Sequence, residues 1–195
     1  FIMANLDTVT SWDQLEFDLF LRDSRAYESY FYDNVNETIN GVNYTDLYEW
    51  YSQDDLGNSY VSLFGGPKIK VDDNFLMSGG TVTGYLEGVY DTEIGDYVPI
   101  FGLENISING ADIIDASRTV DTTDDQALIA EAFMGDDNVS LSNYDDTVFT
   151  WDGNDVVSAF GGNDHLSGGE GNNYLDGGLG DDTYIYGFDG VDVVT

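Results

Sequence analysis

Residues 161–184 read GGNDHLSGGEGNNYLDGGLGDDTY, and this stretch repeats itself every nine residues. Its three units follow the pattern G-x-D-x-U, in which U is a large apolar residue and Asn173 replaces the Asp of the second unit. The same register extends backward to Gly135 and, after one inserted residue, forward to Val194. A fixed short period of this kind predicts a chain that winds as a solenoid, because each repeat buries its apolar face only against its neighbours.

Each position of the repeat has a physical role. Glycine adopts backbone conformations that other residues avoid, so it allows sharp turns whose carbonyl groups point inward. The Asp adds a carboxylate to these carbonyls, and the resulting all-oxygen ligand set suits Ca²⁺ rather than zinc or copper. The predicted turn glycines are Gly135, Gly153, Gly162, Gly169, Gly171, Gly178 and Gly180. The residues expected to point into the solenoid are Val139, Val148, Val157, Leu166, Leu175, Tyr184 and Val194.

The period also predicts which carboxylates come together. Nine residues make one turn and one short strand, so two repeats complete a coil and turns on the same side lie two repeats apart. One side is expected to stack Asp137, Asp155, Asn173 and Asp192, and the other Asp146, Asp164 and Asp182. A calcium ion between successive stacked turns would take a carboxylate from each, and we expect about three to five ions in all.

These nonapeptides, with the fuller form G-G-x-G-x-D-x-U-x at Gly168-Gly169 and Gly177-Gly178, resemble the RTX, or hemolysin-type calcium-binding, repeats. The resemblance covers roughly the last third of the chain. It implies a parallel β-roll in a secreted bacterial protein that the type I secretion machinery exports unfolded and that folds on extracellular calcium. The chain departs from the pattern at two positions. Tyr144 stands where a turn glycine is expected, which predicts a strained or reshaped turn, and Asn173 removes a charge and should weaken its site.

The charge of the chain supports this interpretation. The formal net charge is −33, and all five basic residues precede position 119, so nucleic acid is excluded as a natural partner. From Thr119 onward there are seventeen Asp and Glu and no Lys or Arg, so we expect this segment to stay open until cations bind. The alternative is a disordered Gly/Asp-rich linker, but a linker does not need apolar residues at every ninth position. The chain has no Cys, no apolar run long enough to span a membrane and no basic-then-apolar signal segment at its start.

Residues 1–108 differ in composition and are expected to form a small α+β domain rich in aromatics. Ser11 and Gln14 fit a capping box, so we expect a helix over about 12–30, and a second short helix from Asn43 through Tyr51. Five β-like runs separated by glycine breaks are expected to form antiparallel strands: 60–64, 68–71, 74–77, 80–89 and 98–108. The whole chain is therefore predicted to be mainly β, with this domain followed by the β-roll over 109–195.

The segment between the two regions predicts a cap. Residues 109–115 resemble a first, isolated repeat turn, and the repeat is then interrupted up to Met134. Strong helix formers after Asp124 and Asp125 predict a helix over about 124–133. Leu128, Ile129 and Phe133 are close enough in angle to form one buried stripe, so this helix is expected to cover the open end of the roll.

Candidate catalytic residues are few. His165 is the only histidine and falls at a solvent-facing repeat position, so we interpret it as a surface residue rather than a metal ligand or catalytic group. A glycosidase-like carboxylate pair stays formally possible, but nothing selects one, and we do not expect an enzyme. The aromatic segment from Tyr27 to Tyr51 is either a sugar-stacking platform or, by preference, core.

Three functions remain compatible with the sequence. The first is a calcium-binding RTX module that folds on extracellular calcium and serves as a structural and secretion module. The second is a calcium-dependent module that binds polysaccharide or a cell surface, as an adhesin does. The third is the non-catalytic N-terminal part of a larger secreted RTX enzyme whose catalytic centre lies elsewhere.

Overall fold

The computed structural model describes residues 5–8, 26–39, 42–53, 56–74, 76–119, 123–187 and 190–195, and these residues are mainly β. Their contacts divide the chain into two compact units. The roll unit comprises residues 1–17, 101–106 and 129–195, and the aromatic unit comprises residues 18–100 and 107–128. This division differs from the boundary predicted at 108/109, because the chain leaves and re-enters each unit.

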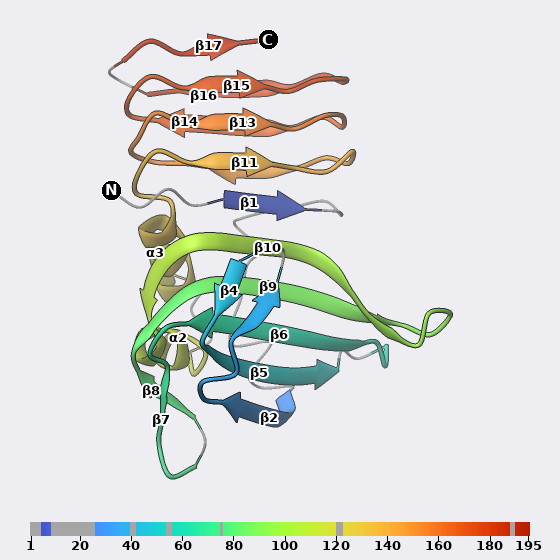
Figure 1. Ribbon diagram of the computed structural model, residues 1–195. Coiled ribbons are helices and arrows are strands. Elements are labelled where there is room, and N and C mark those ends of the chain that lie inside the picture. Colours follow the sequence, from blue (N-terminus) through green and yellow to red (C-terminus); the bar gives the residue numbers. More distant parts are fainter. Residues whose placement is uncertain are drawn as a thin grey trace. The chain divides into compact units, whose positions relative to one another are not determined.

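The repeats form the predicted parallel β-roll (Figure 1). Its strands are β11 (Asn138–Ser140), β12 (Thr147–Phe149), β13 (Val156–Ser158), β14 (His165–Gly169), β15 (Tyr174–Asp176), β16 (Thr183–Tyr186) and β17 (Val193–Val194). β11, β13, β15 and β17 pair in parallel on one side, and β12, β14 and β16 on the other. Val139 lies opposite Val157, and Val157 opposite Leu175, so the two-repeat spacing is confirmed.

The apolar residue of each repeat fills the interior of the roll as predicted. Five of these residues have no more than 2% of their surface exposed, namely Val139, Val148, Val157, Leu166 and Leu175. In the last coil Tyr184 is half-buried and Val194 is 36% exposed. Each strand therefore contributes one apolar side chain to the interior, Leu141 and Ala159 directly after β11 and β13 are buried as well, and each coil depends on the coil beside it for burial.

A strand from the start of the chain extends the roll, and the repeat gave no sign of it. β1 (Asn5–Thr8) pairs in parallel with β11, with Leu6 opposite Val139. On its other side β1 pairs antiparallel with residues 101–104 of β10 (Asp96–Asn109). The first coil of the roll thus gains a backbone partner from a segment more than one hundred residues away in the sequence.

The two segments between β10 and the roll are helices. α3 (Thr123–Ala132) confirms the predicted helix, and Leu128, Ile129 and Phe133 are all buried as expected. The Phe133 ring lies 6.4 Å from the ring of Trp151 in the roll, centroid to centroid. Residues 109–115 are not a repeat turn, and that prediction was wrong. They form α2 (Gly110–Ala116), because the Asn109 side chain accepts a hydrogen bond from the Ala111 amide at 3.0 Å and caps the helix.

The aromatic unit contains an antiparallel sheet in the order β10-β9-β6-β5-β2. Its further strands are β2 (Ala26–Tyr32), β5 (Asp46–Gln53), β6 (Ser59–Gly66) and β9 (Thr81–Asp91). Two small hairpins accompany it, β3 (Glu37–Ile39) with β4 (Val42–Tyr44) and β7 (Lys70–Val71) with β8 (Met77–Gly79). Four of the runs predicted after residue 60 are therefore confirmed as strands with shifted ends, whereas the run predicted over 74–77 overlaps β8 only at Met77 and contains a turn residue, Asn74.

Neither of the two helices predicted in the first fifty residues is present among the described residues. Residues 26–30, the end of the first, lie in β2, and the rest of it lies outside the described residues. The second prediction, Asn43 through Tyr51, was wrong, because this segment forms β4 and β5. β5 pairs with β2 on one side and β6 on the other, and this tertiary pairing outweighs the local helix signal.

One face of this sheet is an aromatic core. Tyr48, Trp50, Phe64 and Tyr85 are buried and contact one another, with ring centroids 4.9–6.3 Å apart. The Trp50 Nε1–H donates to the Tyr48 hydroxyl at 3.0 Å, so the polar atom of this indole is satisfied inside the core. The preferred interpretation of the aromatic segment as core is thus correct for the residues on this face.

Candidate calcium-binding turns

The turn carboxylates of one side of the roll stack as the period predicts. The Asp137 amide donates to Asp155 Oδ1 at 2.9 Å, and the Asp155 amide donates to Asn173 Oδ1 at 2.9 Å. The Asn173 amide and Nδ2 both donate to Asp192 Oδ1, at 3.1 and 3.0 Å. Each side chain therefore caps the backbone of the preceding coil, and we call this series of contacts the inner ladder.

The inner ladder recurs on the opposite side. The Asp146 amide donates to Asp164 Oδ1 at 2.8 Å, and the Asp164 amide donates to Asp182 Oδ1 at 3.0 Å. All seven predicted side chains thus lie in the two predicted stacks. In Asp155, Asp164, Asp182 and Asp192, one carboxylate oxygen accepts from the backbone amide of the neighbouring coil.

The second oxygens of Asp155 and Asp164 carry the strongest indication of a cation. Both residues are almost fully buried, and Oδ2 of each is buried with no hydrogen-bond partner. Burial, with a smaller contribution from neighbouring carboxylates, raises the pKa of each carboxyl to about 6. A buried carboxylate oxygen without a donor is costly, so the residues present fit a cation placed between the coils.

The turn backbone supplies the other oxygens that such a cation needs. Among the described residues, no three His, Cys, Asp or Glu side chains come close enough to hold a metal by themselves, so backbone carbonyls must complete any site. Calcium takes six to eight oxygen ligands and accepts carbonyls readily. The turn carbonyls lie close to the next coil, since a Cβ on Gly153 would sit 1.6 Å from the Gly135 oxygen. Only glycine fits there.

The predicted glycines behave as turn residues with one exception. Positive φ values, between 67° and 148°, occur at Gly153, Gly162, Gly169, Gly171, Gly178 and Gly180. Gly135 does not have positive φ, and its amide donates to the Asp152 carbonyl at 2.7 Å. Trp151 and Phe160 have φ of 55° and 62° at the positions that Gly169 and Gly178 occupy one coil later, so two aromatic residues adopt a conformation that favours glycine.

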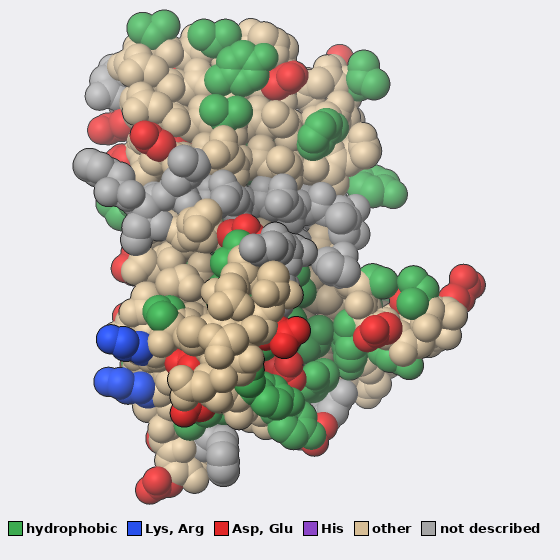
Figure 2. Space-filling view, viewed as in Figure 1, with side chains coloured by type: hydrophobic (Ala, Val, Ile, Leu, Met, Phe, Trp, Pro, Cys, Tyr) green, Lys and Arg blue, Asp and Glu red, His purple; other side chains and the backbone are tan. Residues whose placement is uncertain are grey.

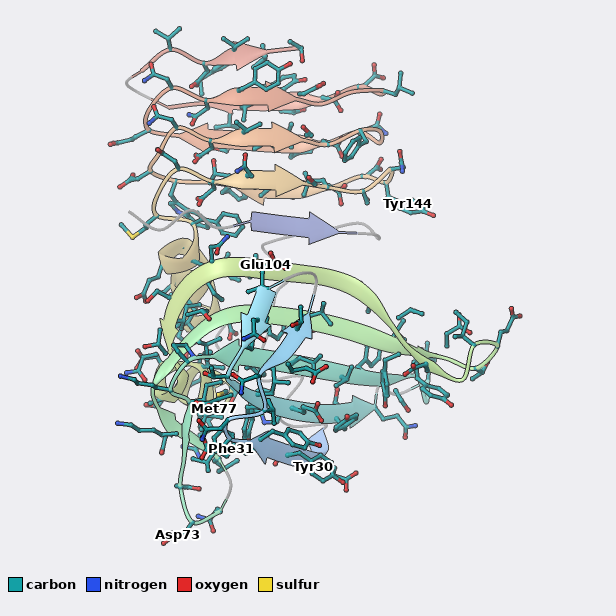
Figure 3. The ribbon with its side chains drawn as sticks, viewed as in Figure 1. Tyr30, Phe31, Asp73, Met77, Glu104 and Tyr144 are labelled. Carbon is teal, nitrogen blue, oxygen red and sulfur yellow. The ribbon has the colours of Figure 1, made fainter. Side chains whose placement is uncertain are left out.

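The turn that contains Tyr144 is reshaped rather than strained. Tyr144 does not have positive φ, and its side chain is 62% exposed and extends away from the roll (Figure 3). The amide and the hydroxyl of Ser142 both donate to Asp146 Oδ2 at 2.9 Å. The oxygen that remains free in Asp155 and Asp164 is therefore satisfied by the protein itself in Asp146.

A second series of contacts runs outside the first, and we call it the outer ladder. The residue before each turn Asp is Asn or Asp in six repeats, and these side chains also bridge coils. Asp136 Oδ1 accepts from the Asn154 amide at 2.8 Å, and Asn154 Oδ1 accepts from the Asn172 amide at 3.1 Å. On the other side Asp145 Oδ1 accepts from the Asn163 amide at 2.7 Å. We did not predict this ladder, although the recurring Asn and Asp could have indicated it.

The two ladders differ in electrostatics. Asp136 of the outer ladder is exposed, and hydrogen bonds from Asn154 lower the pKa of its carboxyl. Asp155 of the inner ladder is buried, and its pKa is raised. The outer ladder is therefore complete without a cation, whereas the inner ladder contains carboxylates that a cation would stabilise. His165 belongs to neither ladder and is exposed on β14, as expected.

Comparison with known families agrees with this geometry. The family described as RTX calcium-binding nonapeptide repeat (4 copies) matches residues 132–159 and 161–184. These residues are therefore a calcium-binding RTX region. No curated protein and no solved structure was found to match the chain. Neither helix among the described residues is long and apolar enough to cross a membrane.

Proposed function

We propose that extracellular calcium folds the RTX region, and that the folded roll is a structural and secretion module of a secreted protein. The observation that carries this proposal is the pair of buried, unpartnered oxygens on Asp155 and Asp164. They lie in a segment with seventeen acidic residues and no basic one, so no side chain of the roll can neutralise them. Folding without cations would concentrate like charges and bury two carboxylates, and both effects oppose it.

Two kinds of oxygen in the roll, carboxylate and backbone carbonyl, would bind the ion. The inner-ladder carboxylates, Asp155 and Asp164 foremost, would face it with their second oxygens, and the glycine turns would add carbonyl oxygens. Bound calcium supplies positive charge that offsets these carboxylates and links neighbouring coils. The predicted ligands Asp137, Asp182 and Asp192 occupy equivalent ladder positions. Asn173 gives an amide oxygen, and Asp146 already has its second oxygen bonded to Ser142.

The charge of the roll also suits export in an open state. Extracellular modules bind calcium with dissociation constants of roughly 10⁻⁴ to 10⁻³ M, a range that leaves sites empty in the cytosol and filled outside. The type I secretion machinery would then meet an unfolded segment, and the folded roll would appear only after export. This proposal assigns no catalytic role to the described residues.

Calorimetry and circular dichroism with a matched pair of variants test the proposal. The native chain in EDTA should lack the β signal of the roll and gain it at millimolar calcium. Asp164→Asn removes a charge from the inner ladder and should lower the amount of bound calcium and raise the calcium midpoint. Asp145→Asn removes the same charge from the outer ladder, where the carboxylate is exposed, and should leave the stoichiometry unchanged. A β signal that does not change with calcium, or an equal loss of bound calcium in both variants, would contradict the proposal.

The stacking itself predicts unequal sites. Asp164 lies between Asp146 and Asp182 and can serve two sites, whereas Asn173 supplies no charge to its sites. Asp164→Ala should therefore lose more bound calcium than Asn173→Ala when both are titrated by calorimetry. Equal stoichiometry in these two variants would mean that neighbouring coils do not share ions.

A further inference from the structure

The face of the aromatic unit opposite its core carries a continuous row of tyrosines. Tyr32, Tyr30, Tyr51, Tyr97 and Tyr90 contact one another in that order, with ring centroids 6.3, 5.9, 5.8 and 5.3 Å apart. They come from β2, β5, β10 and β9, so the row runs across the sheet rather than along one strand. We call these five residues the tyrosine row.

The alternation of the strands places these rings on the accessible side. In β5, Tyr48 and Trp50 point into the core, whereas Tyr51 and Glu49 are only partly covered. In β2, Tyr30 and Tyr32 are 41% and 39% exposed, and Tyr90 in β9 is 41% exposed. Figure 2 shows hydrophobic side chains gathered over this part of the unit with carboxylates among them. So much exposed aromatic surface in one place is unusual on a soluble domain and marks a contact surface.

Two carboxylates are built into the row. The Tyr30 hydroxyl donates to Glu28, and the Tyr51 hydroxyl donates to Glu49 at 3.0 Å. The register places Tyr30 opposite Glu49 and Glu28 opposite Tyr51, so rings and carboxylates alternate between the two strands. Burial and the bond to Glu49 raise the pKa of Tyr51, so its hydroxyl stays a donor at neutral pH. The face thus offers flat apolar rings beside oriented hydrogen-bond acceptors.

The charge of this face restricts the ligand. None of the strands β2, β5, β6, β9 and β10 contains a Lys or Arg, and the chain carries a net charge of −33. Anionic polymers such as nucleic acids, acidic polysaccharides and phosphate headgroups are repelled by such a surface, and these described strands offer them no Lys or Arg. The occupant must be neutral or cationic, must present apolar faces to the rings, and must donate hydrogen bonds to the carboxylates.

We propose that the tyrosine row is a binding surface for a neutral polysaccharide. A sugar ring has an apolar C–H face that packs on tyrosine and a rim of hydroxyls that donate to Glu28 and Glu49. The row crosses an open sheet, so it offers successive rings to successive units of an extended chain. A cationic peptide also satisfies the charge argument, because its ammonium and guanidinium groups can pack on tyrosine rings and donate to carboxylates, and it is therefore one outcome of the test below.

Affinity electrophoresis and pull-down on defined polysaccharides test this proposal. The probes are soluble dextran, galactomannan, xyloglucan and hydroxyethyl cellulose, and insoluble cellulose and chitin. At least one of them should retard or capture the native chain, and Tyr30→Ala/Tyr32→Ala should lose on the order of tenfold in affinity, since two of the most exposed rings are gone. The matched control is Tyr174→Ala/Tyr186→Ala, which removes two comparably exposed tyrosines from the roll and should bind as the native chain does.

A conservative variant and a rival probe complete the test. Tyr30→Phe/Tyr32→Phe keeps the rings and should retain most of the affinity, which separates stacking from a folding defect. Calcium titrations of all these variants should match the native chain, so a failure here leaves the calcium proposal standing. The inference is overturned if no neutral polysaccharide on the panel is bound, if Tyr30→Ala/Tyr32→Ala binds as the native chain does, or if only poly-lysine responds to the loss of the rings.

Discussion

The roll unit and the aromatic unit are both mainly β, but different forces hold them. The roll has one apolar side chain per strand in its interior and joins its coils by the inner and outer ladders. The aromatic unit packs large rings such as Trp50 and Phe64 against one another, and its buried carboxylates Asp46 and Glu87 accept hydrogen bonds from the protein itself. The roll is therefore expected to depend on a ligand for its stability, and the aromatic unit on its own hydrophobic core.

Removing calcium should separate the two regions most strongly. In EDTA, the amides of β13 and β15 should lose their protection from hydrogen exchange, because the carboxylates between the coils then repel one another. The amides of β5 and β6 should stay protected, since the packing of Trp50 and Phe64 needs no metal. Hydrogen exchange followed by mass spectrometry measures both regions in one sample. Equal loss in the two sets of strands would show that the units share one source of stability.

Removing one buried ring from each region is the next largest perturbation. Phe133 is fully buried against Trp151, and Phe64 is buried between Trp50 and Tyr85. Each change to Ala should cost about 3–5 kcal/mol in the free energy of unfolding of its own region. Phe133→Ala should also raise the calcium midpoint, because folding and binding are coupled in the roll. Urea unfolding and calorimetry check both variants, and a calcium midpoint that moves equally in Phe64→Ala would break the contrast.

The comparison also explains what the sequence could predict. In the roll every rule is local: a glycine turns, an Asp follows two residues later, and the apolar residue after it points inward. The stacking of Asp155 on Asn173 and the burial of Leu166 follow from counting residues. The pairing of β1 with β11 could not be counted, because it joins Leu6 to Val139 through a contact that no local pattern encodes. Likewise, only the structure shows that the Ser142 amide donates a hydrogen bond to the second carboxylate oxygen of Asp146.

In the aromatic unit local signals were less reliable. Residues 43–51 have helical spacing, yet they become β4 and β5 because β2 and β6 offer backbone partners on both sides. The two interpretations of the aromatic segment, core or sugar-stacking platform, each hold for part of it. Strand alternation sends Tyr48 and Trp50 into the core and leaves Tyr51 on the other face. A helix assignment hides that alternation, so the tyrosine row could not be derived from the segment alone.

Acid should partly replace calcium in the roll. Burial raises the pKa of Asp155 and Asp164 to about 6, above the ordinary carboxyl value, so the folded roll binds more protons than the unfolded chain between about pH 4 and 6. Stability without calcium should therefore rise as the pH falls through 6 toward 4, and should be lost as the pH rises through 6. Circular dichroism in calcium-free buffer at pH 7.5 and 5 measures this change.

The control for this pH response is Asp164→Asn, which should weaken it because one of the two titrating groups is gone. In saturating calcium the sign should reverse, since protons then compete with the ion for the same carboxylates. The core of the aromatic unit should show neither response. A β signal that falls on acidification without calcium would contradict the assignment of buried charge to the inner ladder.

The smallest expected effect comes from two aromatic residues on the same edge of the roll. Phe160 has φ of 62°, which is unfavourable for a residue with a Cβ by roughly 1–2 kcal/mol, and Gly178 occupies the equivalent position one coil later. Phe160→Gly should therefore stabilise the calcium-loaded roll by up to about 1 kcal/mol after the entropy cost of glycine. Tyr144 stands where a glycine was expected but does not have positive φ, so Tyr144→Gly relieves nothing and should destabilise by about 0.5–1 kcal/mol. Urea unfolding in saturating calcium gives the two signs. If both variants gain stability, the repeat pattern alone governs the turns, and if they differ in sign, the local backbone does. We expect opposite signs, because the Ser142–Asp146 contact has already given the Tyr144 turn a geometry of its own.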